Sequence, residues 1–292
     1  MHLVWRCLAG GWLLLSGELS AQDTLEAEQR DFIERFQGAT APARSSAAER
    51  ATAANVLMAE LDRRGLDGER RAYRASNVHP LLDLVMPPFA GVNITATIPA
   101  TRAEAQVIVI GGHYDSEAGS PGADDNASGI AAALSIAEAI AAEEERHYTV
   151  LLAFFDQEEE GKVGSAALVR QLLDDGLDIH SMHSIDMGGW DSDNDRAIEI
   201  DAPDGWFPRY AAAAVDMGIP VTRVTYDSSD HVPFRDRGID AICMGEAFRE
   251  GDSSPHRHRP TDTADKLNHA YLARNTRLMR AVLLDAIRGG SR

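Results

Sequence analysis

Short, largely apolar runs, each followed by a helical pattern, recur through the middle of this 292-residue chain. Three of them are Gln106–Ile110, Tyr148–Phe155 and Met182–Met187, and Ile239–Met244 follows later. Continuously apolar strands are buried on both faces, which is typical of a parallel sheet covered by helices. The sequence therefore predicts an α/β fold, with a mostly parallel, mixed central sheet and helices on both faces.

Helical patterns and one alternating segment complete this outline. Ser46 is followed three residues later by Glu49, which is a capping-box pattern at a helix start, and Gly65 is placed to end that helix. The run after Gly91 alternates as a half-buried strand does. The helices that we expect cover residues 23–37, 45–65, 127–145, 165–175 and 265–287.

The first 21 residues have the pattern of a secretory signal peptide. Arg6 precedes an apolar run that reaches Leu15, and small residues close the segment at Ala21. This run is far shorter than the ~20 residues that span a bilayer, so we expect no membrane span. We predict a signal peptide over residues 1–21, one domain over residues 22–292, and a secreted or periplasmic protein.

Composition excludes several classes of function. The chain has 46 Asp and Glu against 28 Lys and Arg, a net charge of −18, whereas nucleic-acid binding depends on clusters of Lys and Arg. Removal of Cys7 with the signal peptide would leave Cys243 with no disulfide partner. No HExxH, GxSxG or P-loop motif indicates a thermolysin-like enzyme, a serine hydrolase or a nucleotide site.

Residue types that bind metals follow each of the three central strands. His113 and Asp115 end the first, Glu158–Glu160 follow the second, and Asp186 follows the third. Ligands collect at the carboxyl ends of parallel strands, which lie ~4.8 Å apart, so we expect these side chains to converge. Histidine combined with carboxylates suits zinc or a similar divalent ion.

Between about residues 90 and 270, six runs occur in an order that resembles the secreted co-catalytic di-zinc aminopeptidases of metallopeptidase family twenty-eight. The runs are GGHYDS, GADDNASG, DQEEEGKVGS, SIDMGG, SDHVPF and HRPTDTADKL. The resemblance implies a single-domain zinc-exopeptidase fold, so residues 22–292 would form the zinc peptidase catalytic domain. It also implies two zinc ions per chain and hydrolysis of the N-terminal residue from peptides with a free N-terminus.

The same resemblance implies a role for individual residues. Glu158 would be the general base, and Asp115 would accept the second N–H of the His113 imidazole. A cis peptide would follow Asp125. The implied metal ligands are His113 and Asp186 for one zinc, Glu159 and His258 for the other, and Asp125 as a bridge between them. Asp230 and His231 would belong to the substrate pocket, and for His231 we favour a structural role in shaping that pocket over metal ligation.

Four points stay open at the level of sequence. The three glutamates allow a shift by one residue, with Glu159 as base and Glu160 as ligand, although the spacing to Gly161 favours Glu158 and Glu159. His256 competes with His258, and the spacing to Asp262 favours His258. Arg257 stands where some relatives have an oxyanion-stabilising Tyr. Residues 191–195 resemble the start of a calcium loop but lack its glycine, so we favour an exposed acidic loop.

Competing functions are a glutaminyl cyclase, a carboxypeptidase and a binding protein without activity. A cyclase shares the fold but uses one zinc, and its relatives carry ATDS-like residues where this chain has residues 123–126 (ADDN). A protein that only binds would have lost ligands or the base, and this chain retains all of them. The sequence therefore favours the aminopeptidase.

Overall fold

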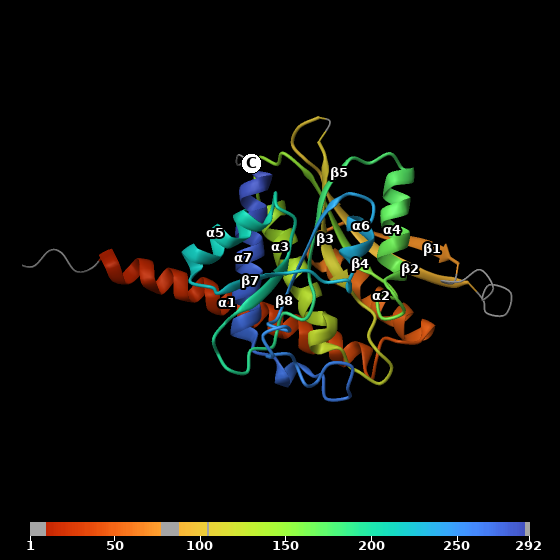
Figure 1. Ribbon diagram of the computed structural model, residues 1–292, viewed down its shortest axis with the longest axis horizontal. Helices are drawn as coiled ribbons and strands as arrows, with labels where there is room; N and C mark the ends of the chain where they lie inside the picture. Colours follow the sequence, from red (N-terminus) through yellow and green to blue (C-terminus); the bar gives the residue numbers. More distant parts are fainter. Residues whose placement is uncertain (1–9, 77–87, 104, 290–292) are drawn as a thin grey trace, which may run out of the picture.

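An eight-stranded sheet forms the centre of the computed structural model, which describes residues 10–76, 88–103 and 105–289 (Figure 1). The strand order is β1-β2-β4-β3-β5-β8-β6-β7. The strands are β1 (Gly68–Ala75), β2 (Phe89–Ile98), β3 (Val107–His113), β4 (Thr149–Phe155), β5 (Ile179–Ile185), β6 (Ile198–Asp201), β7 (Val221–Val224) and β8 (Asp240–Gly245).

The strands at the centre of the sheet are parallel. β4, β3, β5 and β8 all run in one direction, and β6 and β7 are also parallel to each other. Antiparallel pairs join β1 to β2, β2 to β4, and β8 to β6. The predicted mostly parallel, mixed sheet is therefore confirmed, and its antiparallel pairs lie toward the two edges.

Side-chain alternation along the strands divides the interior into two cores, because successive residues point to opposite faces. Ile108 and Ile110 of β3 pack into the larger core, and Val107 and Val109 pack into the smaller one. In Figure 1, α3 and α7 lie on one side of the central strands and α4 and α6 on the other. The helices are α1 (Gly10–Thr40), α2 (Ala47–Arg63), α3 (Gly129–Ala141), α4 (Val163–Asp174), α5 (Phe207–Met217), α6 (Val232–Arg235) and α7 (His269–Ile287).

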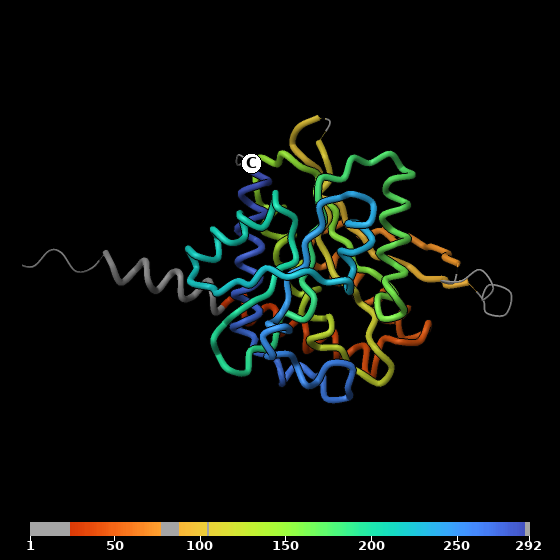
Figure 2. Tube along the Cα trace, viewed as in Figure 1, coloured from red at the N-terminus to blue at the C-terminus, as the bar shows by residue number. Residues whose placement is uncertain are grey.

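The two ends of the described chain pack together. Gln29 of α1 donates a hydrogen bond of 2.8 Å to the Thr276 hydroxyl of α7, and in Figure 2 the two helices cross. The capping box of α2 is present as predicted, with the Ser46 side chain accepting the Glu49 N–H. Residues 1–9 of the predicted signal peptide lie outside the described residues, and its cleavage stays a prediction.

Several elements differ from the sequence prediction. The expected helix over residues 127–145 begins only at Gly129, because a turn of π-helix over Ala123–Ser128 precedes it. The expected closing helix divides into a 3-10 turn at Ala264–Lys266 and α7, which Asn268 caps. The prediction missed β1, β6, β7, α5 and α6. β1 carries Glu and Arg side chains at the sheet edge, and β6 and β7 have four residues each.

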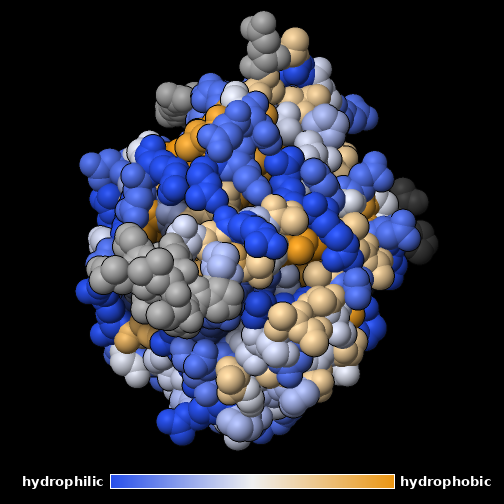
Figure 3. Space-filling view, turned by 90° about the vertical axis from the view of Figure 1, so that its right-hand side faces the viewer, coloured by the Kyte–Doolittle hydropathy of each residue, from blue (hydrophilic) through white to orange (hydrophobic). Residues whose placement is uncertain are grey.

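The visible surface of the protein is largely polar. The face seen in Figure 3 is mostly hydrophilic, with small and scattered apolar areas. Across the described residues, no helix combines the length and apolar character that crossing a membrane requires.

The close approach of β3 to β4 gives a test of the fold. A Cβ atom at Gly111 would lie 1.8 Å from the Ala153 carbonyl oxygen, so neighbouring backbone must move. We expect Gly111→Ala to lower the free energy of unfolding by about 3 kcal/mol or more, measured by urea denaturation. Gly38→Ala is the control, because no atom lies within 4 Å of its added Cβ, and it should change stability by less than about 1 kcal/mol. Equal effects of both substitutions would contradict this packing.

Candidate metal centre

The three strands whose ends carry the predicted site are neighbours in the sheet, in the order β4-β3-β5. His113 is the last residue of β3 and lies opposite Phe155 of β4. Glu158 and Glu159 follow β4, and Asp186 follows β5, where its N–H donates to the Met244 carbonyl of β8 at 3.0 Å. The expected convergence at the carboxyl ends of the strands is confirmed.

Asp125 lies at the middle of the site, in the turn that precedes α3. Its Oδ1 is 3.2 Å from Nε2 of His113, and its Oδ2 is 3.1 Å from Nε2 of His258. The peptide bond from Asp125 to Asn126 is cis, as the resemblance implied. Each oxygen of this carboxylate therefore faces a different histidine.

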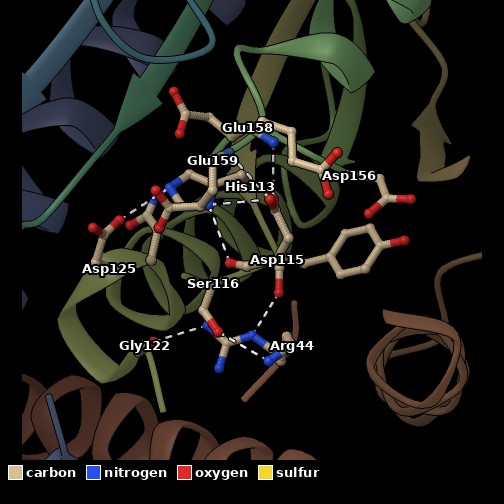
Figure 4. Close-up of polar contacts among 12 residues, drawn as sticks. Arg44, His113, Asp115, Ser116, Gly122, Asp125, Asp156, Glu158 and Glu159 are labelled. Atoms are coloured by element: carbon tan, nitrogen blue, oxygen red, sulfur yellow. Dashed lines mark hydrogen bonds and ion pairs between the residues drawn. The ribbon is translucent and has the colours of Figure 1, made fainter. Parts of the chain in front are cut away.

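A second carboxylate accompanies each histidine. His113 Nε2 lies 3.6 Å from Asp186 Oδ1, and His258 Nε2 lies 3.0 Å from Glu159 Oε2. Figure 4 shows His113, Asp125 and Glu159 gathered in one cluster. The site thus consists of two groups of ligand-type residues that share Asp125.

The polar atoms of this cluster fit a bound cation better than they fit one another. Nε2 of His113, Oδ2 of Asp125 and Oε1 of Glu159 are buried and make no hydrogen bond of good geometry, although the first two lie 3.2 and 3.1 Å from polar atoms of neighbouring ligand-type residues. These three residues also each offer a ligand atom within 4.8 Å of the others. Because buried polar atoms nearly always have partners, this donor set suits a zinc-like ion.

Burial and the neighbouring charges shift the pKa values of several groups in this cluster. Burial raises the pKa of Glu158 to about 7 and that of Glu159 to about 8. Burial also disfavours the charged form of His113, but the carboxylates of Asp115, Asp125 and Asp186 outweigh it and raise the pKa of His113 well above its ordinary value. A divalent cation here would offset the cost of burying several carboxylates together.

Asp115 lies behind the site, where it contacts a different set of groups from the one implied. The carboxylate of Asp115 accepts the main-chain N–H groups of Glu158 at 3.0 Å and Glu159 at 3.1 Å (Figure 4). His113 Nδ1 is hydrogen-bonded to the Asp115 carbonyl oxygen at 3.2 Å, while the carboxylate oxygen is 3.5 Å away. Asp115 therefore orients the imidazole mainly through its main chain and holds the glutamate loop through its side chain.

The structure separates the competing residues of the sequence. Glu160 faces away from the cluster, with Oε1 3.5 Å from Arg50 Nη1. His256 contacts Thr261 at 2.9 Å and packs its ring against Trp190, whereas His258 reaches the carboxylates. Glu159 and His258, rather than Glu160 and His256, thus belong to the cluster.

A cavity of about 250 Å³ opens beside the cluster. Glu158, Asp125, Asp186 and Arg257 line the end nearest the cluster. Its other walls are mostly apolar or small and comprise Met187, Tyr226, Ser228, Ser229, Cys243, Gly245 and Phe248. It has room for a single side chain of a substrate.

Asp230 and His231 were expected at the substrate pocket, with His231 as a structural residue that shapes it. The residues just before them, Ser228 and Ser229, line the wall of the cavity. The side chains of Asp230 and His231 are fully buried. His231 Nε2 lies 3.2 Å from Asp201 Oδ2, and the same oxygen accepts the Tyr226 N–H at 2.8 Å. His231 therefore supports the wall of the cavity from behind.

Two site residues were not predicted as functional. The Asp262 carboxylate accepts the N–H groups of Asp124 at 2.8 Å and Asp125 at 3.2 Å, which fixes the main chain of the shared ligand. Arg257 Nε lies 3.5 Å from Asp125 Oδ2, beside the cavity. Both residues belong to the run HRPTDTADKL or flank it, but their contacts cross more than a hundred residues and leave no local pattern.

The acidic loop over residues 191–195 forms its own local hydrogen bonds. Asp193 accepts the Asp195 N–H at 3.0 Å, and Asp195 accepts the Ala197 N–H at 2.7 Å. Asp191, Asp193 and Asp195 offer carboxylate oxygens within 4.8 Å of one another, and Asp193 and Asp195 are exposed. These bonds agree with the interpretation as an exposed acidic loop.

Comparison with known proteins places this site in a family. Residues 93–283 match the sequence profile of peptidase family M28, and the chain belongs to that family. A probable leucine aminopeptidase from Arthroderma otae is 27% identical over 202 residues, which are 64% of this chain and 55% of the relative. The chain thus spans little more than half the length of the curated relatives that it matches first.

Solved structures show the same fold. A zinc aminopeptidase from Bacillus subtilis superposes with a TM-score of 0.78 at 16% identity, covering 91% of this chain and 96% of the other. A glutaminyl cyclase from an Acidobacteriales bacterium gives a TM-score of 0.70 at 20% identity, covering 89% and 94%. The fold is therefore common to peptidases and cyclases.

Metal binding at the cluster can be measured without an activity assay. Zinc at about 100 times its Kd should raise the free energy of unfolding of metal-stripped protein by about 2.7 kcal/mol, measured by thermal denaturation. We expect Asp125→Asn to remove most of this stabilisation, because Asp125 faces both histidines.

Asp193→Asn in the exposed acidic loop is the matched control and should retain the stabilisation by zinc. If the loop substitution abolished it while Asp125→Asn did not, zinc would bind at the loop.

Proposed function

We propose that this chain is an aminopeptidase that binds two zinc ions and hydrolyses the peptide bond after the N-terminal residue of a peptide. The observation that carries the proposal is the carboxylate of Asp125, which turns one oxygen to His113 and the other to His258. A carboxylate in this position suits a bridge between two cations. Membership of peptidase family M28 supports the same activity.

The clustered residues divide into two sets of ligands. His113 and Asp186 would hold one ion, Glu159 and His258 would hold the other, and Asp125 would bind both. When bound, zinc supplies Lewis-acid polarisation of the scissile carbonyl and lowers the pKa of a water molecule toward neutrality.

Glu158 is positioned to move the proton during hydrolysis. Its side chain reaches the cavity, while its N–H is held by the Asp115 carboxylate at 3.0 Å. As general base, Glu158 takes a proton from the attacking water and then passes it to the leaving amine. A rigid main chain at this residue keeps the carboxylate in place for both transfers.

The surroundings of the cavity define a class of substrate. Glu158, which is not assigned to a metal, lines the cavity and can accept a hydrogen bond from a free α-amino group. The walls formed by Met187, Tyr226 and Phe248 favour an apolar first side chain. Relatives named as probable leucine aminopeptidases support this preference.

A glutaminyl cyclase is the second candidate, because two solved cyclases share the fold. Such an enzyme would release ammonia from an N-terminal glutamine and form a ring by intramolecular acyl transfer. His113 and His258 lie on either side of Asp125, which gives two groups of ligand-type residues. This arrangement favours the aminopeptidase, because a cyclase with one zinc would need only one group of ligands.

Replacement of the general base gives the sharpest test of mechanism. We expect Glu158→Gln to lower kcat on a leucyl nitroanilide about 100- to 10,000-fold, because the substituted amide cannot accept the proton. Zinc content, measured by metal analysis, should stay at two ions per chain.

Glu160→Gln is the matched control, since Glu160 faces Arg50 and not the cavity. It should retain activity close to that of the unsubstituted protein. Full activity in Glu158→Gln would eliminate this residue as the base.

Substrates with different N-termini test the type of reaction. We expect rapid hydrolysis of leucyl nitroanilide, slower hydrolysis of glutamyl nitroanilide, and none of acetyl-leucyl nitroanilide, because the acetyl group removes the positive charge. Release of ammonia from a peptide with N-terminal glutamine, without nitroanilide hydrolysis, would instead identify a cyclase. Equal cleavage of free and acetylated substrates would contradict an aminopeptidase.

A further inference from the structure

Arg44 is a fully buried arginine in the segment that connects α1 to α2. It lies outside residues 93–283, which carry the family match. A charged side chain rarely has no exposure unless its hydrogen bonds are satisfied. The partners of Arg44 therefore indicate what it does.

The guanidinium of Arg44 binds the loop that follows β3. Nε donates to the Tyr114 carbonyl at 2.5 Å, Nη2 donates to the Gly122 carbonyl at 2.9 Å, and Nη1 donates to the Pro121 carbonyl. The main chain adds to this attachment, since the Arg44 N–H donates to the Ser116 hydroxyl at 2.9 Å. Figure 4 shows Arg44 below Ser116, with a dashed line that joins it to Gly122.

This loop connects two of the candidate ligands. It begins after His113 and ends before Asp125, and the arginine contacts it at both ends. Buried carbonyl groups need donors, and a planar guanidinium can serve three of them at once where a lysine ammonium cannot match the spacing.

Close packing around Gly122 restricts the main-chain conformation of this loop. Gly122 has a φ of 62°, and a Cβ atom there would lie 2.5 Å from both Arg44 Nη2 and the Asp125 carbonyl oxygen. The glycine therefore allows the arginine to approach the main chain just before the shared ligand.

The charge of Arg44 is also set within the site. Burial lowers the pKa of its guanidinium to about 10, while the nearby carboxylates of Asp115, Asp262, Asp125 and Glu159 act in the opposite direction. The arginine thus stays a cation and keeps its full set of donors at neutral pH.

We infer that Arg44 is a positioning residue for the metal ligands: it holds the loop over residues 114–122 so that His113 Nε2 and Asp125 Oδ1 stay 3.2 Å apart. This role depends on the proposed zinc site, and Arg44 supports that site from outside residues 93–283. The end of α1 that precedes the segment of Arg44 supports a second loop, because Gln37 of α1 accepts the Ala264 N–H at 2.9 Å, close after Asp262.

The test measures zinc release from full-length, zinc-loaded protein into excess chelator, well below the melting temperature. Arg44→Lys keeps the charge but loses the fork of donors. We expect zinc to leave this variant about 10-fold faster or more, since residues that orient ligands commonly change metal affinity by that factor.

Arg64→Lys is the matched control. Arg64 is also a largely buried arginine beside α2, but it pairs with Glu60 at 2.7 Å and Glu138 at 2.5 Å instead of the metal-site loop. We expect it to lower the melting temperature without changing the rate of zinc release. Equal acceleration in both variants would overturn the inference, because it would reflect general destabilisation.

Ser116→Ala provides a milder second variant, in case Arg44→Lys does not fold. It removes the hydroxyl that accepts the Arg44 N–H and should accelerate zinc release by a factor of about 2 to 10. A rate equal to that of the unsubstituted protein in every folded variant would overturn the positioning role. Failure of the unsubstituted protein to bind zinc would instead overturn the proposed function.

Discussion

The geometry of the site depends on one carboxylate, that of Asp125, which contacts two histidines at once. Asp125 turns its oxygens to His113 and His258, and two contacts fix the main chain at and before this residue. The Asp262 carboxylate binds its N–H, and the preceding Gly122 carbonyl is held by Arg44. Neither restraint comes from the strand that carries the histidine. The geometry of the site is therefore a property of several loops that support one another.

Burying several carboxylates close together has an electrostatic cost, and different carboxylates of the site are stabilised in different ways. Asp115 is stabilised by two main-chain N–H groups, so its charge is solvated by the protein. Glu159 and Asp125 each retain a buried oxygen that makes no hydrogen bond of good geometry. The fold alone stabilises the carboxylate of Asp115, whereas a cation would be needed to stabilise those of Asp125 and Glu159. This contrast separates the acids that support the site from those that would bind the metal.

Much of the fold and most of the cluster were predictable from the residues. Apolar runs such as Tyr148–Phe155 identified the central strands, and the polar residues after them converge as expected. The edge strands were missed because β1 is rich in charge and β7 is very short, so neither has a strong pattern. Arg44 was missed for another reason: its contacts lie some seventy positions away, and nothing in its own neighbourhood distinguishes it from an exposed arginine.

The ligand-type residues lie far apart along the chain, from the end of β3 to the loop beyond β8. Closing such long loops costs entropy before any contact forms, so the cluster assembles only after the central strands have paired. An unfolded chain offers the same side chains without the arrangement, and it would hold zinc weakly. We therefore expect metal capture to be a late event in folding, and a bound ion would report that the whole sheet has been completed.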